Sequence, residues 1–288
     1  MSNQKSNKTP WLLSSPALFM YALLLIVPMV MTLVLSFRSF LPMVGIQDDF
    51  ILSNYIEVFT DPYFQEIFLR TFVISILTAL FCVLLGVPEA YILNRMRAPW
   101  KGIFFLVTLG PLLVSVVVRT LGWAVIFGRE GVISEIAQFI GLSDKPITLM
   151  YTQTGVLIAL VHVLVPFMVL SVWASLQRLD PETERAAISL GASPFTVMHK
   201  IVLPQIMPGI LSGSVIVFAL TATAFATPSM IGGRSLKVVA TTTYDEFLHS
   251  LNWPLGAALA IVLLVFNVVI IAGYNRYIER KFTQVFES

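Results

Sequence analysis

The chain has 288 residues, of which 57% are hydrophobic and 12% charged, and its formal net charge is +2 at pH 7. Soluble domains carry roughly 25% charged residues, so this composition excludes an ordinary soluble domain and indicates a protein whose solvent is the lipid bilayer. The single cysteine, Cys82, excludes a disulfide framework within the chain.

Six apolar runs follow one another along the chain, and each can cross a hydrocarbon core at about 20 residues per span. The first run is too long for a signal-peptide core and lacks a small-residue cleavage site, so we interpret it as a retained span. In hydrocarbon the backbone must satisfy its own polar groups, which predicts helices. The predicted spans are 12–37, 68–94, 102–127, 152–177, 206–231 and 255–278.

This pattern predicts an all-α polytopic membrane protein, with one six-helix domain over residues 12–278 and tails at 1–11 and 279–288. With six spans both termini lie on one side of the membrane. That side carries the excess of lysine and arginine in short loops, which predicts cytoplasmic termini by the positive-inside rule. Its basic residues are Lys5, Lys8, Arg95, Arg97, Lys101, Arg178, Arg185, Lys200, Arg276, Arg280 and Lys281.

The connection over residues 39–67, between the first and second spans, is long enough to fold as short amphipathic helices. In the second span Glu89 lies near the cytoplasmic end, where it pairs with Arg95 or Arg97 or lines a solute path. In the third span Arg119 must face protein or water, either bracing the bundle through carbonyl groups or lining a cavity.

Four residues near the outer ends of spans are candidates for contact with a cationic solute, which favours carboxylates and aromatic faces. Ordinary interfacial positions are the alternative for the same residues. They are Trp123, Tyr244, Asp245 and Glu246. In the fourth span His162 is expected to be a packed, hydrogen-bonded residue. Small residues over 212–233 predict close helix packing, with Pro228 and Gly232-Gly233 breaking the fifth span near its outer end.

The connection over residues 178–204 predicts a helix–turn–helix at the cytoplasmic surface. Asp180 followed by Pro181 is typical of a helix start, and Gly191 is typical of a helix end. Ser193-Pro194 starts a second helix by the same logic. Between these limits Ala186, Ala187 and Leu190 have the spacing of residues that share one helix face. An amphipathic loop on lipid headgroups is the alternative.

The spacing of Ala186-Ala187, Gly191, Ile201 and Leu203-Pro204 resembles the cytoplasmic signature E-A-A-x3-G-x9-I-x-L-P of binding-protein-dependent ABC importer permeases. Arg185 stands where that family usually has glutamate, and Glu184 lies one residue earlier. Nearly the whole chain also looks like the first permease subunit of spermidine/putrescine-type importers, through segments such as "SNYIEVFTDPYF", "TPSMIGG" and "NWPLGAALAI".

The resemblance implies a type I ABC importer permease of the bacterial inner membrane, with 178–204 as its coupling loop. It implies a cytoplasmic ATPase dimer, a second related permease subunit and a periplasmic or lipid-anchored solute-binding protein as partners. It implies that the ATPase contact comes from Glu184, Arg185, Ala186, Ala187, Leu190, Gly191, Ala192, Ser193, Pro194, Ile201, Leu203 and Pro204. The candidate path residues remain Glu89, Arg119, Trp123, Tyr244, Asp245 and Glu246.

The chain contains no sequence motif typical of a nucleotide-binding, metal-binding or catalytic site. It contains no Gly-Lys pair and therefore no G-x4-G-K-[ST] phosphate loop, so a partner must use ATP and Mg. No metal-ligand or nucleophile motif appears, and we expect neither an enzyme activity nor a cofactor on this chain. A polyamine is the expected solute; an opine, an amino-acid-like compound, another amine or iron are the alternatives. A secondary transporter is the competing class, which would show inverted repeats and several intramembrane acids.

Overall fold

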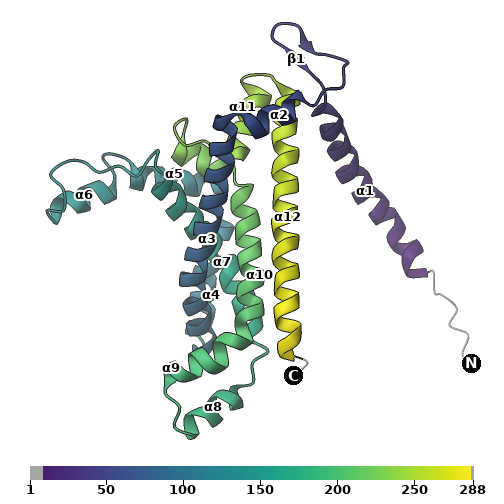
Figure 1. The fold of residues 1–288 in the computed structure, drawn as a ribbon. Coiled ribbons are helices and arrows are strands. Elements are labelled where there is room, and N and C mark those ends of the chain that lie inside the picture. Colours follow the sequence, from purple (N-terminus) through teal and green to yellow (C-terminus); the bar gives the residue numbers. More distant parts are fainter. Residues whose placement is uncertain (1–8, 287–288) are drawn as a thin grey trace, which may run out of the picture. The chain divides into compact units, whose positions relative to one another are not determined.

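The computed structural model describes residues 9–286, with side chains for 14–180 and 182–276. The chain divides into two compact units, Met1–Pro62 with Thr243–Phe266 and Tyr63–Thr242 with Asn267–Ser288. Within the described residues the chain is helical apart from one two-stranded hairpin and the connections (Figure 1). The predicted all-α membrane fold is confirmed.

The first unit begins with a helix that is apolar all round. Helix α1 (Thr9–Leu35) leaves its most apolar 18-residue window wholly unburied inside the structure, so its surroundings must be lipid or other protein. Strands β1 (Phe40–Leu41) and β2 (Gly45–Ile46) form an antiparallel hairpin with Phe40 opposite Ile46. Helix α2 (Ser53–Thr60) follows and confirms a short amphipathic helix in this connection.

Hydrogen bonds at the end of α1 hold α2 in place. The Asn54 side-chain amide donates to the carbonyls of Ser36 and Arg38 at 2.9 and 2.8 Å, and the hydroxyls of Ser36 and Tyr55 are 2.6 Å apart. Phe37 stacks on Phe50 with ring centroids 4.7 Å apart. These contacts satisfy the carbonyls that the end of α1 leaves open. The last part of α11 and the first part of α12 complete the unit.

The second unit holds most of the bundle. Its elements in chain order are α3 (Pro62–Arg95), α4 (Trp100–Leu113), α5 (Val116–Phe127), α6 (Val132–Phe139), α7 (Gln153–Leu176), α8 (Pro181–Ser189), α9 (Pro194–Val197), the π-helix η1 (Met198–Val202), α10 (Leu203–Ala222), the π-helix η2 (Pro228–Gly232), α11 (Val239–Leu248) and α12 (Trp253–Phe286). The boundaries between the units fall at the start of α3, inside α11 and inside α12.

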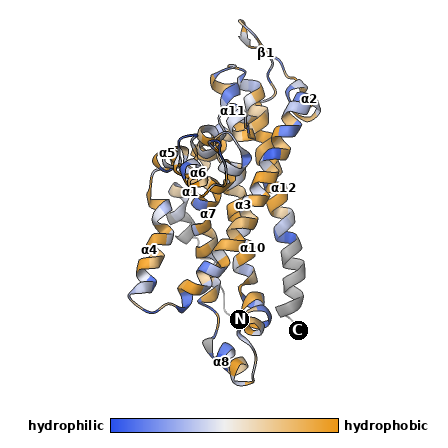
Figure 2. Ribbon diagram, turned by 90° about the vertical axis from the view of Figure 1, so that its left-hand side faces the viewer, coloured by the Kyte–Doolittle hydropathy of each residue, from blue (hydrophilic) through white to orange (hydrophobic). Residues whose placement is uncertain are grey.

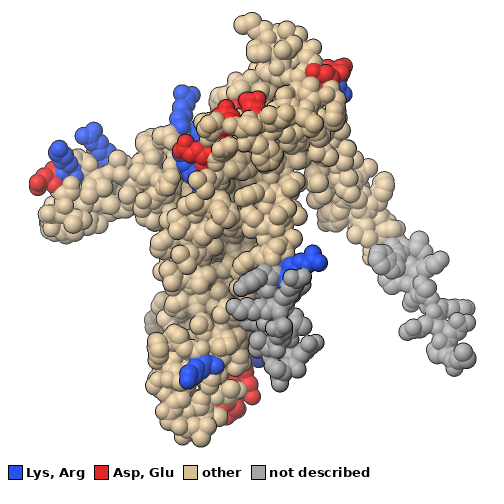
Figure 3. Space-filling view, in the orientation of Figure 1, with Lys and Arg blue, Asp and Glu red and all other residues tan. Residues whose placement is uncertain are grey.

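Two apolar clusters form the core of this unit. The larger one joins α3, α7 and α10 and reaches the connection over residues 178–204 through Val197 and Val202. The smaller one joins Ile74 of α3 and Phe127 of α5 to α7 and η2. Figure 2 shows hydrophobic residues along α3, α4 and α10, and polar residues on α8. Figure 3 shows few charged atoms over the middle of this face, as a lipid-facing surface requires.

Helices α7 and α10 approach closely because glycines lie between them. A Cβ atom on Gly209 would lie 2.4 Å from Ser175 Oγ and 2.6 Å from the Ser171 carbonyl oxygen, and one on Gly213 would lie 2.7 Å from Met168 Sδ. The predicted close packing of the small-residue span therefore occurs within the bundle, where the missing side chains let the two backbones meet.

Five described helices are long and apolar enough to cross a membrane, or six if the bent pair that begins at Trp100 counts as one span. That pair corrects the prediction of one continuous helix over 102–127, because the chain bends by 96° between α4 and the segment that begins with α5. Val114 and Ser115 are extended, with ψ of 138° and 135°. Pro111 weakens the last turn of α4, since it has no N–H to donate.

The fifth span also differs from the prediction of 206–231. Helix α10 begins earlier and ends at Ala222, and the next helical turn is η2. The break falls at Thr223, upstream of Pro228, which has no N–H to bond to the carbonyl four residues earlier. The second and fourth spans match their predictions, although α3 begins at Pro62 rather than at 68.

Both terminal helices extend into the predicted tails within the described residues. Helix α1 already includes residues 9–11, and α12 continues through 279–286, which were predicted as tail. The remainder of the two predicted tails, 1–8 and 287–288, lies outside the described residues.

Candidate functional site

Helix α8 is bounded by strong local signals at both ends. Asp180 Oδ1 accepts a hydrogen bond from the Glu182 backbone N–H at 3.0 Å, which caps the helix start as predicted. At the other end Gly191 has φ +86°, and backbone bonds run from Gly191 N to Ile188 O and from Ala192 N to Ala187 O. This pair of bonds is a Schellman motif, which favours glycine because of the left-handed backbone. The corner is therefore specified by its sequence.

The second half of the connection runs into the membrane without interruption. Ser193 Oγ accepts from the Thr196 N–H at 3.2 Å and starts α9, as predicted. The π-helix η1 precedes Pro204, and the Leu203 N–H bonds to Met198 O, five residues back, so the helical path continues into α10. Ile201 and Leu203 pack against the larger core cluster, so movement of this segment reaches the bundle core directly.

Helix α8 has an inner and an outer face. Ala187 and Ala192 pack toward the core cluster, whereas Leu190 is 89% exposed and Phe195, which follows in α9, is 72% exposed. Of the three residues predicted to share one face, Ala186 and Leu190 are exposed and Ala187 packs toward the core cluster, so the prediction is wrong for Ala187. The outward surface is thus formed by Arg185, Ala186, Ile188, Leu190 and Phe195, and we call it the outer face.

The two charged residues of the signature have separate partners. Glu184 forms an ion pair with Arg95 at the end of α3, and its side chain is only 13% exposed. Arg185 is 73% exposed and pairs with Glu182 at 2.6 Å along its own helix. The carboxylate thus belongs to the inner face and the guanidinium to the outer face.

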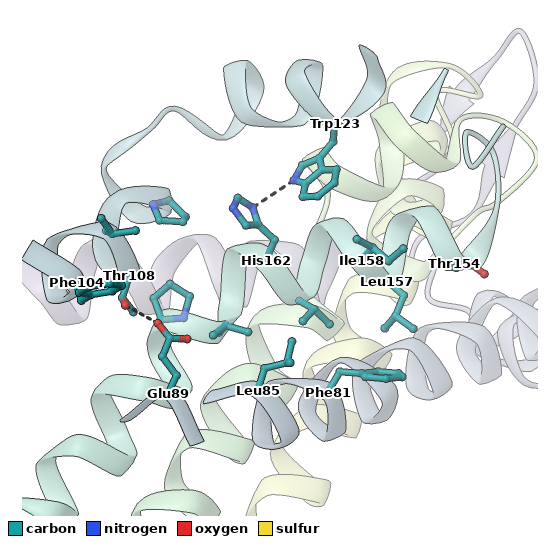
Figure 4. Close-up of a pocket in the computed structure, with 15 residues that line it drawn as sticks. Phe81, Leu85, Glu89, Phe104, Thr108, Trp123, Thr154, Leu157, Ile158 and His162 are labelled. Atoms are coloured by element: carbon teal, nitrogen blue, oxygen red, sulfur yellow. Dashed lines mark hydrogen bonds between the residues drawn. The ribbon is translucent and has the colours of Figure 1, made fainter. Parts of the chain in front are cut away.

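A cavity of about 740 Å³ lies in the second unit among α3, α4, α5 and α7. Its walls are mainly apolar and aromatic, and the ionisable side chains among its lining residues are Glu89 and His162 (Figure 4). The lining residues are Phe81, Leu85, Glu89, Phe104, Val107, Thr108, Pro111, Trp123, Thr154, Leu157, Ile158, Val161, His162, Val165 and Pro166.

Glu89 meets α4 inside this cavity. Thr108 Oγ1 donates to Glu89 Oε1 at 2.5 Å, as the dashed line in Figure 4 shows. The predicted pairing of Glu89 with Arg95 is wrong, because Arg95 pairs with Glu184 and lies over the Tyr91 ring, 4.5 Å from its centroid. Glu89 is therefore a cavity carboxylate held by a hydroxyl group.

A second polar pair lies across the same cavity. Trp123 Nε1 donates to His162 Nδ1 at 3.2 Å, and their ring centroids are 5.3 Å apart (Figure 4). Because indole nitrogen only donates, Nδ1 is an unprotonated acceptor and Nε2 remains available as a donor. His162 is hydrogen-bonded, as expected.

Arg119 braces the break between α4 and α5. Its Nη1 donates to the carbonyl of Pro111, which lacks the helical partner it would have if α4 continued. The structure thus favours the carbonyl-bracing alternative, and Arg119 is not among the cavity-lining residues.

Tyr244, Asp245 and Glu246 lie together on α11, in the first unit. Burial raises the pKa of the Glu246 carboxyl, and the charges of Glu57 and Asp245 raise it further against the lowering hydrogen bond from Ser250. Burial and the charge of Asp61 likewise raise the pKa of Glu57. This end of the first unit therefore holds several carboxylates in mutual repulsion.

The structure places Glu89 and Trp123 in one cavity, although they lie in different predicted spans. Tyr244, Asp245 and Glu246 lie together on α11. Sequence reasoning missed Thr108 as the partner of Glu89 and Arg95 as the partner of Glu184. A threonine in an apolar helix gives no distinctive signal, because threonines commonly bond to their own helix. The Arg95–Glu184 pair joins residues 89 positions apart, which no local pattern predicts.

A family model described as "Binding-protein-dependent transport system inner membrane component" matches residues 6–284. The spermidine/putrescine transport system permease protein PotB of Haemophilus influenzae is 28% identical over 233 residues, covering 80% of this chain and 81% of that protein. The molybdenum transport system permease protein ModB of Mycobacterium bovis is also 28% identical, covering 81% of this chain and 87% of that protein.

Among solved structures, a bacterial ABC transporter that imports the acidic polysaccharide alginate has a chain with a TM-score of 0.81 at 19% identity. The match covers 96% of this chain and 98% of that one. A chain of the MetNI methionine ABC transporter has a TM-score of 0.58 at 14% identity, covering 77% of this chain and 99% of that one. At these identities the likeness is one of fold.

Proposed function

The chain belongs to the family of binding-protein-dependent transport system inner membrane components, and from this premise we propose how its surfaces serve an ABC importer. It is a multi-pass permease subunit. In our proposal it forms half of a polyamine path with a second, related permease subunit. A partner ATPase dimer supplies the ATP and Mg chemistry, because this chain has no phosphate loop.

The outer face of the α8–α9 connection carries the proposal. An exposed apolar group on a rigid corner outside the membrane-spanning helices is typical of a protein interface. In our account the ATPase covers Ile188, Leu190 and Phe195 and pairs with Arg185. The continuous path from α9 through η1 into α10 then transmits ATPase closure to the bundle.

We assign this connection and both termini to the cytoplasm, on the positive-inside rule. A periplasmic or lipid-anchored binding protein delivers the solute on the other side. ATP binding closes the ATPase dimer and opens the path outward, and hydrolysis resets it. The alginate transporter solved with a pentasaccharide-bound periplasmic protein supports this kind of assembly.

The cavity favours a cation as solute. Because identities to permeases of spermidine/putrescine and of molybdenum systems are equal, our proposal of a solute rests on the cavity. Its one carboxylate, Glu89, and the faces of Phe81, Phe104 and Trp123 suit an ammonium group, while its apolar walls suit methylenes. A putrescine- or spermidine-like polyamine combines both features. The carboxylates of α11 would attract it at the outer side.

Co-expression with the ATPase tests this assignment. We expect the ATPase to co-purify with the chain in detergent and to be lost when Leu190→Asp places an uncompensated charge in the interface. Leu142→Asp makes the same leucine-to-aspartate change at an exposed position after α6 and serves as the control. We expect this variant to retain the ATPase. Failure of the unaltered chain to retain an ATPase contradicts the importer proposal; equal retention by both variants contradicts the docking surface.

A further inference from the structure

The Arg95–Glu184 pair joins the coupling loop to a helix that the loop does not continue into. Helix α8 follows α7 and precedes α9, η1 and α10, so the chain itself carries its movement to α7 and α10. The ion pair adds a third connection, to the cytoplasmic end of α3. The Glu184 side chain is 13% exposed and that of Arg95 is 50% exposed, so the pair is partly shielded from solvent.

Neighbouring contacts hold both ends of this connection. The Arg95 guanidinium lies over the Tyr91 ring one turn earlier in α3, which fixes its direction. One residue before it, Asn94 Oδ1 accepts a hydrogen bond at 2.7 Å from Gln177 Nε2, just beyond the end of α7. Two adjacent residues at the end of α3 therefore hold this region together. Arg95 pairs with Glu184 in α8, and Asn94 bonds to Gln177 just before α8.

The same end of α3 carries the cavity carboxylate. Glu89 and Arg95 are six residues apart on one helix, and Pro88 precedes Glu89 immediately. Proline removes the backbone bond to the residue four positions earlier and weakens the helix there. Above it, Gly86 packs so tightly on α7 that a Cβ atom would lie 2.8 Å from Met168 Cγ. The two turns from Glu89 to Arg95 therefore follow a weakened point, while the helix before them is held against α7.

We propose that the Arg95–Glu184 pair transmits the movement of α8 to the last two turns of α3 and so repositions Glu89 relative to Thr108 in the cavity. Arg95 and Glu184 are positioning residues, since neither lines the cavity. The proposal also assigns Glu184 to the permease itself, leaving Arg185 as the signature charge that the ATPase meets. It rests on the importer function proposed above, because the displacement of α8 comes from the ATPase.

A charge-exchange experiment in proteoliposomes tests this connection. The assembled importer is loaded with its binding protein and putrescine, and uptake is measured together with ATP hydrolysis. The variants are Arg95→Glu, Glu184→Arg and the double exchange. Arg97→Glu is the matched control, because it makes the same charge change two residues away at an exposed position that forms no ion pair within residues 14–180 and 182–276.

We expect each single exchange to lower uptake per ATP hydrolysed at least about tenfold, because like charges then face each other at the joint. The double exchange should restore most of the ratio, and Arg97→Glu should match the unaltered chain. Recovery in the double exchange separates transmission from simple misfolding, and immunoblotting verifies equal amounts of assembled complex.

Two results overturn the inference. If Arg95→Glu behaves as Arg97→Glu while the unaltered importer is active, the pair does not transmit movement and the importer function stands. If both single exchanges and the double exchange lose uptake equally in assembled complexes, the pair has no joint role. An unaltered chain that supports neither putrescine uptake nor uptake of any other solute presented by its binding protein contradicts the importer proposal itself, on which this inference rests.

Discussion

Glu89 is a carboxylate in an apolar cavity, where an unpaired charge is costly. One hydrogen bond from Thr108 compensates only part of that cost, and a cationic solute would complete it. The Glu89 carboxylate therefore favours binding of a positively charged solute. Arg119, by contrast, donates a hydrogen bond to the Pro111 carbonyl, which has no helical partner, and so stabilises the fold.

Glu89→Gln should therefore raise the apparent KM for putrescine uptake about tenfold or more, since the amide keeps the shape and removes the charge. Glu135→Gln, in α6 and outside the cavity lining, is the control and should leave uptake unchanged. Uptake assays with radiolabelled putrescine measure both. Unaltered kinetics in Glu89→Gln would remove this carboxylate from the solute path.

Glu246 illustrates a residue whose ionisation opposes the folded state. Its pKa is raised above the ordinary value of 4.5, mainly by burial, so the folded form binds its proton more tightly than the unfolded form. Stability therefore falls as pH rises from about 4.5 through the raised pKa, and the full penalty is present above it. A carboxylate kept at such a position suits capture of a cation.

Glu246→Gln should accordingly protect α11 from amide hydrogen exchange at pH 7 and have little effect near pH 4, after correction for intrinsic exchange rates. The same change should slow polyamine uptake. Glu130→Gln, on the exposed turn after α5, serves as the reference and should change neither. A loss of protection at pH 7 would contradict this account of the Glu246 environment.

At the scale of elements, the corner between α8 and α9 depends on one backbone angle. Gly191 has φ +86° with open space around its Cα, so a substitution there meets conformational strain rather than a clash. Valine should cost roughly 1–2 kcal/mol, whereas asparagine tolerates the left-handed region.

We expect Gly191→Val to reduce ATPase co-purification and uptake in parallel, and Gly191→Asn to retain most of both. Expression in membranes, followed by pull-down of the ATPase, measures the first effect. Equal behaviour of the two variants would show that the corner geometry does not govern docking.

The contact between α7 and α10 gives a second element-scale prediction. Gly209→Ala places a methyl group within 2.4 Å of Ser175 Oγ, so overpacking should cost about 1–3 kcal/mol. Gly273→Ala in α12 is the matched control, because no atom lies within 4 Å of its Cβ position and alanine favours the helix. Thermal denaturation in detergent should show a lower midpoint for Gly209→Ala alone.

Most elements could be predicted from apolar periodicity and from caps, because those signals are local. The Asp180 cap, the Gly191 corner and the fourth span are confirmed on such grounds. The 96° bend after α4 could not be predicted, because no glycine or proline marks Val114 or Ser115 in "PLLVSVVVRTLGW" and the bend is stabilised by a hydrogen bond from Arg119 to the Pro111 carbonyl. The cavity and the Arg95–Glu184 pair likewise depend on contacts between distant segments.

At the scale of the molecule, our proposal is a single transport mechanism. It combines the family membership, the membrane fold and the proposed coupling loop. The chain supplies a membrane cavity with a carboxylate and an apolar docking face outside the membrane-spanning helices. Rigid helical connections join the cavity side of the bundle to the docking side, through α10 and through the end of α3. In our proposal, a permease of this construction converts the closure of a partner ATPase into access to a solute path.

The most direct measurement is ATPase turnover of the complete importer in lipid, with and without binding protein and putrescine or spermidine. Our account predicts stimulation that requires binding protein and polyamine together, and that is lost in Gly191→Val while the variant chain still inserts in the membrane. Stimulation by a different solute, with none by polyamines, would contradict the assigned solute, and turnover that ignores the permease and binding protein altogether would contradict the mechanism itself.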